Sequence, residues 1–228
     1  MTATALKTST PVRRRLAALG TAGAIAFGGG AALSAAIDSS PAAAAEQTTQ
    51  HADAQKSSNG QLVAINQFST GLGTQDVDCG PAAVASAMLA QGATPKAWNA
   101  DAPAGAVKQI RADIGSNGAT VGSQLVSALG AQDVKANNDT DFTGALDQVR
   151  KGKTAIVNGE LQLAPYSYGY TPSHSVAHWI TVADYDASSK TFTVLDSNDG
   201  KKHTGVTQAG LEKFQAGVGS GQDQVVVG

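Results

Sequence analysis

The stretch SVAHWITVADYDASSKTFTVLDSN, residues 175–198, decides the fold. It holds two runs rich in β-branched and aromatic residues, 178–186 and 191–197, which are typical of strands. The residues between them, 187–190, are small or polar and suit a turn, so the stretch predicts an antiparallel β-hairpin. Side chains alternate along a strand, so one face of the first strand should carry every second residue. This face is expected to carry His178, Ile180, Val182 and Asp184.

The hairpin brings a histidine and a carboxylate to one end of the sheet. Folding the second strand back places His178 opposite a position between 196 and 199, depending on the loop. Asp196 and Asn198 lie two apart on that strand, so both share a face and can reach His178. A carboxylate beside an imidazole orients a general base and stabilises its cationic form. The plainer interpretation is that His178 only begins a strand and Asp196 only begins a turn.

Outward from the hairpin, strands dominate the second half of the chain and helices the first. Apolar residues recur at helical spacing upstream, whereas the downstream runs alternate as strands do. A series of helices followed by a mostly antiparallel sheet is the α+β class. One predicted helix begins at Cys79, and four others cover 104–114, 121–129, 141–149 and 205–214. Asp141 or Thr140 is the expected cap of the helix over 141–149. Further strands are predicted over 154–159, over 224–228 and, as a short element, over 61–67.

The string Asp78-Cys79-Gly80-Pro81-Ala82-Ala83 places a cysteine at the start of the first helix. Unpaired backbone N–H groups and the positive end of the helix dipole both favour a thiolate at that position. Gly80 allows close approach of the backbone, and Pro81 suits a first helical turn. Asp78 adds a negative charge that disfavours the thiolate unless a cation lies nearby, and a cationic histidine is the usual remedy. Cys79 is therefore the candidate nucleophile.

Cys79 is also the only cysteine of the sequence, which excludes an internal disulfide bond. A lone cysteine is often a small, buried and inert apolar side chain. Composition alone therefore leaves that interpretation open.

Two glutamines upstream of the cysteine are candidates for a further role. A site for acyl transfer needs hydrogen-bond donors for the oxyanion of the tetrahedral intermediate. The side-chain amide of Gln67 or of Gln75 could act together with the backbone N–H of Cys79. Gln67 follows a possible strand and is the better supported of the two.

These segments together resemble the C39-like branch of the papain-like cysteine peptidases. The resemblance rests on Asp-Cys-Gly-Pro-Ala-Ala at a helix start, an upstream Gln, a later His-Trp-Ile-Thr-Val strand and an Asp ending the next strand, and it spans about 61–198. It implies a papain-like fold in which N-terminal helices pack on a mostly antiparallel sheet. It also implies four roles: Cys79 as nucleophile, His178 as general base, Asp196 as third member of the triad and Gln67 as oxyanion donor.

Residues 1–45 have the features of an export signal. Three arginines at 13–15 precede a mildly apolar run over 16–36, and Pro41 with the four alanines after it offers small residues for cleavage. The arginines suggest the twin-arginine route. Five glycines in the run favour a removable signal over a membrane anchor, so we expect a secreted protein. Polar residues 46–60 predict a flexible linker or short pro-segment, and 61–228 then form one peptidase domain.

Charge and histidine spacing narrow the set of partners. Of 16 basic and 18 acidic residues, 4 and 1 lie within the first 45, which leaves the remainder with a formal charge of −5. Nucleic acid and anionic membranes are poor partners for such a surface. The four histidines form no metal-ligand spacing with the cysteine, so no metal or cofactor is expected. His51 falls in the linker, and His174 in a loop whose tyrosines could line a substrate cleft, namely Tyr166, Tyr168 and Tyr170.

The sequence thus predicts a secreted cysteine peptidase that acts on a peptide or protein substrate. One alternative keeps the same three residues and makes the protein an amidase or acyltransferase acting on cell-wall peptides or cross-linking proteins. A second alternative is a non-catalytic secreted binding domain, in which the thiol of Cys79 is unreactive.

Overall fold

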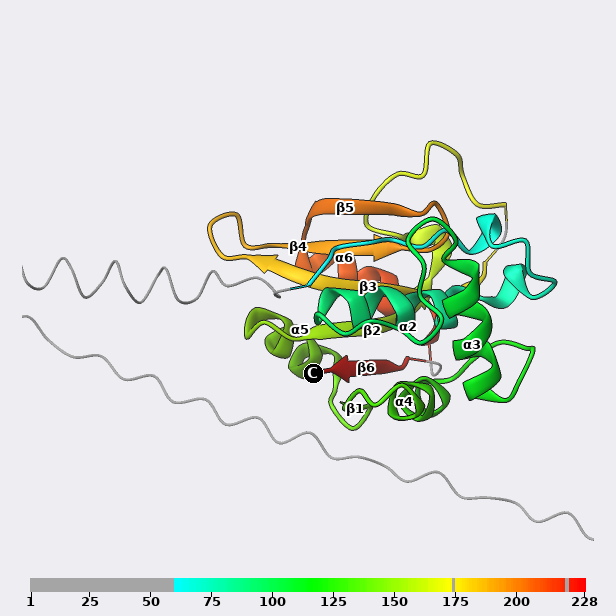
Figure 1. Cartoon of the computed structure of the whole chain (residues 1–228). Coiled ribbons are helices and arrows are strands. Elements are labelled where there is room, and N and C mark those ends of the chain that lie inside the picture. Colours follow the sequence, from blue (N-terminus) through cyan, green and yellow to red (C-terminus); the bar gives the residue numbers. More distant parts are fainter. Residues whose placement is uncertain (1–59, 174, 220–221) are drawn as a thin grey trace, which may run out of the picture. The chain divides into compact units, whose positions relative to one another are not determined.

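A six-stranded antiparallel sheet forms the centre of the computed structural model, which describes residues 60–173, 175–219 and 222–228 (Figure 1). The strand order is β1-β6-β2-β3-β4-β5, so the last strand in the chain is inserted between the first two. The strands are β1 (Ala136–Asn137), β2 (Thr154–Glu160), β3 (Ala177–Asp186), β4 (Thr191–Asp196), β5 (Lys201–Val206) and β6 (Gln224–Val227).

The predicted helices are confirmed where the structure describes them. They are α2 (Cys79–Ala90), α3 (Ala104–Ile114), α4 (Gly122–Ala131), α5 (Phe142–Arg150) and α6 (Gln208–Ala216). Asp141 caps α5 as expected, because its carboxylate accepts a hydrogen bond from the Gly144 N–H at 2.7 Å. No helix among these is long and apolar enough to cross a membrane.

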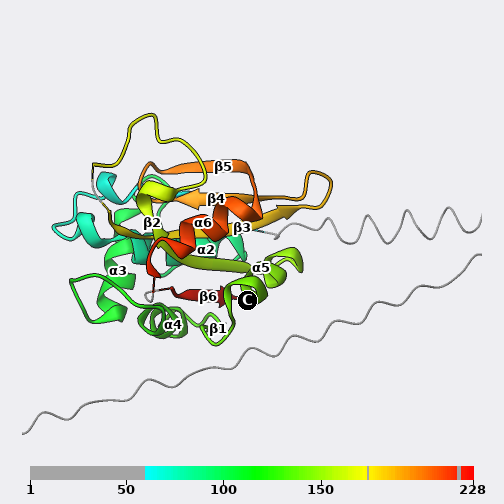
Figure 2. The same cartoon turned by 180° about the vertical axis from the view of Figure 1, so that it is seen from behind.

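The helices cover both faces of the sheet, which gives three layers (Figures 1 and 2). One apolar cluster joins α2, α3 and α4 to Ile156, Trp179 and Val225 of the sheet. A second joins α5 and α6 to side chains of the other face, including Ile180 and Val182. Neighbouring strand residues enter different clusters because side chains alternate across a sheet. Every residue of β2 is therefore buried.

The predicted strand over 61–67 is wrong. The backbone there is bonded to other elements, since the Gln61 N–H donates to the Leu89 carbonyl at the end of α2. The segment ends in a short 3-10 helix, η1 (Gln67–Ser69). Conversely, the polar strand β5 was not predicted, because it is the edge of the sheet and most of its side chains are exposed.

One face of the hairpin also differs from its predicted alternation. The pairing of β3 with β4 shifts register between Val182 and Asp184, which marks a β-bulge. Beyond the bulge Tyr185, rather than Asp184, joins Ile180 and Val182 in the cluster under α5 and α6. An added residue in one strand reverses the alternation, so strict period-two counting fails past this point.

Some of the predictions concern segments outside the described residues. They concern the export signal over 1–45, nearly all of the linker over 46–60, and the two histidines His51 and His174.

Candidate active site

Cys79 is the first residue of α2, and its side chain is half-buried at the end of the sheet where β3 begins. Burial by itself raises the pKa of the thiol. A hydrogen bond with His178, the charge of that imidazole, and the backbone N–H groups of Trp179 and Gly80 act in the opposite direction and prevail. The pKa of Cys79 therefore lies below that of an ordinary thiol, which favours the thiolate.

His178 is a buried residue near the start of β3 and has a partner on each side. Its Nε2 lies 2.7 Å from Oδ1 of Asp196, which leaves Nδ1 as the nitrogen available to Cys79. Burial lowers the pKa of the imidazole, but the charge and hydrogen bond of Asp196, together with Cys79, raise it to about 10. The contacts therefore favour an imidazolium beside a thiolate.

Asp196 ends β4 and is completely buried. Antiparallel pairing places it opposite Ile180, which is two residues beyond His178 on the same face of β3. The predicted juxtaposition of histidine and aspartate is thus present.

The carboxylate of Asp196 accepts four hydrogen bonds. Oδ1 receives His178 Nε2 and the backbone N–H of Asn198, both at 2.7 Å. Oδ2 receives the hydroxyls of Tyr166 at 2.6 Å and Tyr168 at 2.7 Å. Burial raises the pKa of Asp196, but His178 and the two hydroxyls lower it to about 2. The carboxylate is therefore ionised and fixed in orientation.

These contacts correct two expectations. Tyr166 and Tyr168 hold the carboxylate of Asp196 and are not simply the lining of a cleft, although Tyr170 is exposed. The side chain of Asn198 donates to the Tyr170 hydroxyl at 2.6 Å, whereas the hydrogen bond of His178 within the hairpin is with Asp196. Strand β4 ends at Asp196, and the alternation that would have kept Asn198 on the same face ends with it.

Arg111 of α3 is the cation that neutralises Asp78. Both side chains are buried; Nε of the guanidinium donates to Oδ1 of Asp78 at 2.8 Å, and Nη2 lies 2.6 Å from the same oxygen. The hydroxyl of Thr74 donates to the other carboxylate oxygen. The negative charge before Cys79 is thus paired within the protein, so His178 is not needed for this purpose.

The position of Arg111 on its predicted helix could have marked it as a buried charge. Val107, Ile110 and Ile114 form the inner stripe of α3, and Arg111 falls on the same side of the helix. A charged residue on a buried face requires a partner, although only the fold shows that this partner is Asp78.

Gln67 is buried and held at both ends of its amide group. Its Nε2 donates to the Gln75 carbonyl at 2.8 Å, and its Oε1 accepts from the Ser197 hydroxyl at 2.9 Å. The Gln67 N–H also donates to the Ser197 carbonyl. Gln67 is therefore fastened beside the end of β4, next to Asp196. The roles predicted for Gln67 and Gln75 at the oxyanion stay predictions.

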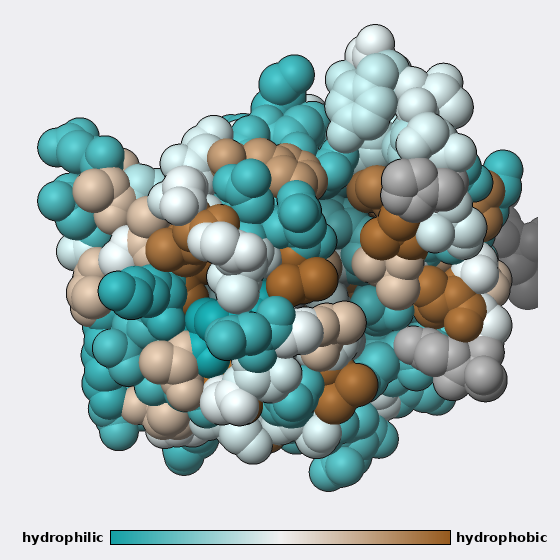
Figure 3. All heavy atoms as spheres, turned by 90° about the vertical axis from the view of Figure 1, so that its right-hand side faces the viewer, coloured by the Kyte–Doolittle hydropathy of each residue, from teal (hydrophilic) through white to brown (hydrophobic). Residues whose placement is uncertain are grey.

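The site lies at one end of the molecule's sheet. The start of α2, the start of β3 and the connection that precedes β3 lie together on the right of Figure 1. Figure 3 shows this side, where hydrophobic patches are separated by hydrophilic side chains around a hollowed surface.

Both the sequence and the fold were compared with those of known proteins. Residues 61–218 match the model of the Peptidase_C39 like family. A crystal structure of a Bacillus anthracis protein assigned to the C39-like peptidases is similar over 48% of this chain and 60% of that chain, at 15% sequence identity and a TM-score of 0.32. The chain thus spans less than two thirds of that protein. No curated protein sequence gives a significant match.

Proposed function

This chain belongs to the Peptidase_C39 like family, and on that premise we propose that it is a cysteine peptidase that hydrolyses peptide bonds with Cys79, His178 and Asp196. The family and the α+β papain-like fold predicted from the sequence are confirmed. We propose further that the protein is secreted, with 1–45 as its export signal.

One observation carries the proposal: the thiol of Cys79 and the imidazole of His178 are hydrogen-bond partners whose pKa values move in opposite directions. A lowered thiol pKa beside a raised imidazole pKa is the condition for a thiolate–imidazolium pair. A lone cysteine that served only as an apolar core residue would need neither partner.

In the proposed reaction the sulfur of Cys79 attacks the carbonyl carbon of the scissile peptide bond. A C–S bond forms, and the carbonyl electrons move to the oxygen. His178 then gives its Nδ1 proton to the leaving amine as the C–N bond breaks, which leaves a thioester on Cys79. Water attacks the thioester after His178 removes its proton, and the acid departs as the thiolate is restored. Asp196 keeps the imidazole in place throughout.

Two groups are proposed to stabilise the oxyanion. The backbone N–H of Cys79 is at the start of α2, where helix N–H groups have no partner within the helix. The second is the Gln67 amide, whose Oε1 is engaged by Ser197 and whose nitrogen carries two hydrogens, one of them donated to the Gln75 carbonyl.

The pH dependence of iodoacetamide alkylation tests the proposed pair. We expect Cys79 to be labelled well below the pKa of about 8.5 of a free thiol, and His178→Ala to shift labelling back towards that value. A Cys79→Ser control should take up no label, because the sequence has no other cysteine. Labelling that follows an ordinary thiol in both the unmodified protein and His178→Ala would contradict the proposal and favour a binding domain.

Digestion of a peptide library separates hydrolysis from acyl transfer. We expect peptide fragments with the unmodified protein and none with Cys79→Ser. A reactive thiol that releases no fragment, but transfers an acyl group to an added amine, would identify an acyltransferase instead.

A further inference from the structure

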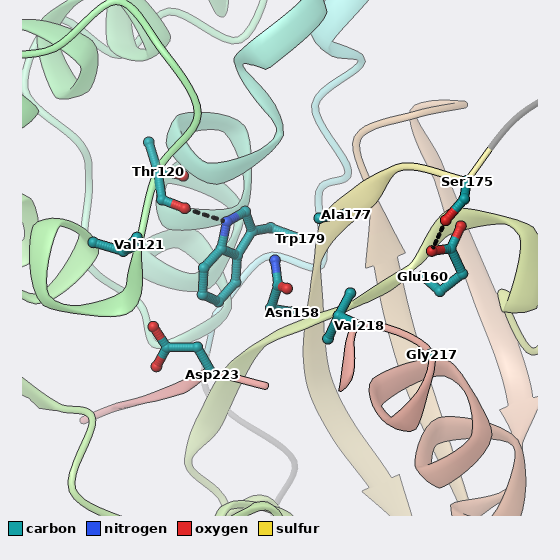
Figure 4. Close-up of a pocket in the computed structure, with 10 residues that line it drawn as sticks. All are labelled: Thr120, Val121, Asn158, Glu160, Ser175, Ala177, Trp179, Gly217, Val218 and Asp223. Carbon is teal, nitrogen blue, oxygen red and sulfur yellow. Dashed lines mark hydrogen bonds between the residues drawn. The ribbon is translucent and has the colours of Figure 1, made fainter. Parts of the chain in front are cut away.

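A cavity of about 420 Å³ is lined by the two residues that flank His178 in the chain, Ala177 and Trp179 (Figure 4). It opens between the start of β3, the last residues of β2, the chain just before α4 and the chain just after α6. Its lining consists of Thr120, Val121, Asn158, Glu160, Ser175, Ala177, Trp179, Gly217, Val218 and Asp223. A volume of this size accommodates a single large amino-acid side chain of a substrate.

Three contacts join the cavity to the reacting atoms. Ala177 and Trp179 line it and are the chain neighbours of His178. The backbone N–H of Trp179 is also a hydrogen-bond partner of the Cys79 sulfur. A Cβ placed on Gly80 would lie 2.2 Å from Oγ1 of Thr120, so this lining residue packs against the residue that follows the nucleophile. A group held in the cavity is therefore close to the sulfur.

The lining is acidic. Glu160 and Asp223 contribute carboxylates, and the described lining residues include no lysine, arginine or histidine. Neither carboxylate forms an ion pair within the described ranges. Asp223 accepts the Gly122 N–H, and Glu160 accepts the Ser175 hydroxyl and the Val176 N–H. These bonds orient the two carboxylates but leave their negative charge unneutralised.

An aromatic ring in the lining also suits a cation. In Figure 4 the indole of Trp179 lies beside Asn158, with Asp223 and Glu160 at opposite sides of the lining, and an aromatic face attracts a cation.

We infer that this cavity is a substrate subsite that accepts a cationic side chain, lysine or arginine, next to the scissile bond. The inference rests on the proposed peptidase function and names the substrate class of the same site. Two unpaired carboxylates attract an ammonium or guanidinium group and repel glutamate or aspartate. Selection of the substrate then depends more on the charge of its side chain in the cavity than on the apolar area that this side chain buries.

Charged thiol reagents test the inference without any turnover. The rate of Cys79 modification is measured with cationic trimethylammonioethyl methanethiosulfonate and with its anionic sulfonatoethyl counterpart, each relative to free cysteine. We expect the cationic reagent to be preferred, and Asp223→Asn to lower that preference by about 25-fold, because one unit charge a few ångströms away changes each of the two rates by about fivefold and in opposite directions. Glu160→Gln should lower it in the same direction. Asp223→Asn keeps an oxygen for the Gly122 N–H, and Glu160→Gln keeps an oxygen for one of the two groups that donate to Glu160.

Asp186→Asn is the matched control for loss of one negative charge. Asp186 is exposed at the far end of β3 from His178, so its substitution should leave the preference unchanged. A preference that falls equally in Asp186→Asn and Asp223→Asn would overturn the subsite, as would a preference that neither Asp223→Asn nor Glu160→Gln alters.

Peptide pairs separate this inference from the proposed function. Substrates that differ only by lysine, norleucine or glutamate beside the scissile bond should be cleaved in that order, and Asp223→Asn should narrow the difference between lysine and norleucine. Equal cleavage of all three would refute the subsite and leave the peptidase intact. Cleavage of none of them, with the reagent preference still dependent on Asp223, would refute the peptidase and retain the cationic subsite.

Discussion

The ion pair between Asp78 and Arg111 should be costly to break, because both of its side chains are buried. Asp78 is 0% exposed and Arg111 is 5% exposed. The guanidinium also donates to the backbone carbonyls of Val77, Ser116 and Gly118, so it joins the loop before Cys79 to the loop after α3. Replacing Arg111 by methionine removes all of these bonds and leaves the carboxylate of Asp78 buried without a cation.

The expected loss is large. Removing one partner of a buried ion pair costs about 3–5 kcal/mol, mainly because the remaining charge is desolvated and unpaired. We therefore expect Arg111→Met to lower the free energy of unfolding by at least about 3 kcal/mol. The unpaired charge next to Cys79 should also raise the thiol pKa and shift its alkylation to higher pH.

Urea unfolding followed by circular dichroism measures the loss, and a double-mutant cycle isolates the pair. Adding Asp78→Asn to Arg111→Met should restore part of the stability, since the buried charge is then absent. Lys96→Met is the control: its pair with Asp133 spans 3.3 Å with side chains 54% and 87% exposed, and its loss should cost no more than about 1 kcal/mol. A cost for Arg111→Met as small as that of Lys96→Met would refute the reasoning.

Three other predictions concern the same site. Gly80→Ala places a Cβ 2.2 Å from Thr120 Oγ1, so it should lower the free energy of unfolding by about 1–3 kcal/mol and slow the alkylation of Cys79. Adding Thr120→Ala should restore part of both. A Gly80→Ala protein with unchanged stability and alkylation would show that the first turn of α2 is not tightly packed. Tyr168→Phe removes a hydrogen-bond donor to Asp196 and should raise the pKa of that carboxyl from about 2. The stability that the lowered pKa of Asp196 contributes is present above the unfolded pKa of about 3.9 and is lost as pH falls, so acid unfolding should begin at higher pH in this variant. An unchanged midpoint of acid unfolding, followed by circular dichroism, would argue against the role of the hydroxyl. Peptide hydrolysis should decline as pH rises through about 10, where His178 loses its proton and with it the charge that stabilises the thiolate. The folding stability due to the raised pKa of His178 is complete below about pH 6.5 and is lost as pH rises through about 10. Hydrolysis that keeps increasing above pH 10 would exclude the imidazolium as the proton donor.

Most local elements could be predicted from the sequence because their causes are local. Apolar spacing and a cap at Asp141 locate α5, and Cys79 with Pro81 locates the start of α2. The hairpin was predictable for the same reason, since its strands are joined by a short turn. Its pairing brings His178 and Asp196, 18 positions apart, to one end of the sheet.

Elements with a weak or irregular apolar pattern were predicted poorly. Edge strand β5 carries little apolar signal, and the segment 61–67 finds backbone partners in Leu89 of α2 and in Ser197, just after β4. The β-bulge after Val182 reverses the alternation, and no residue type in that stretch announces it.

The sequence by itself determined which residues can react: one thiol at a helix N-terminus, and one imidazole with a carboxylate across a hairpin. Only the tertiary structure decided how these groups are brought together and charged. Packing of α2 on β3 joins Cys79 to His178, α3 supplies Arg111 to Asp78, and a distant loop supplies two tyrosine hydroxyls to Asp196. The physical reason is that pKa values depend on burial and on neighbours in space, and a linear pattern specifies neither.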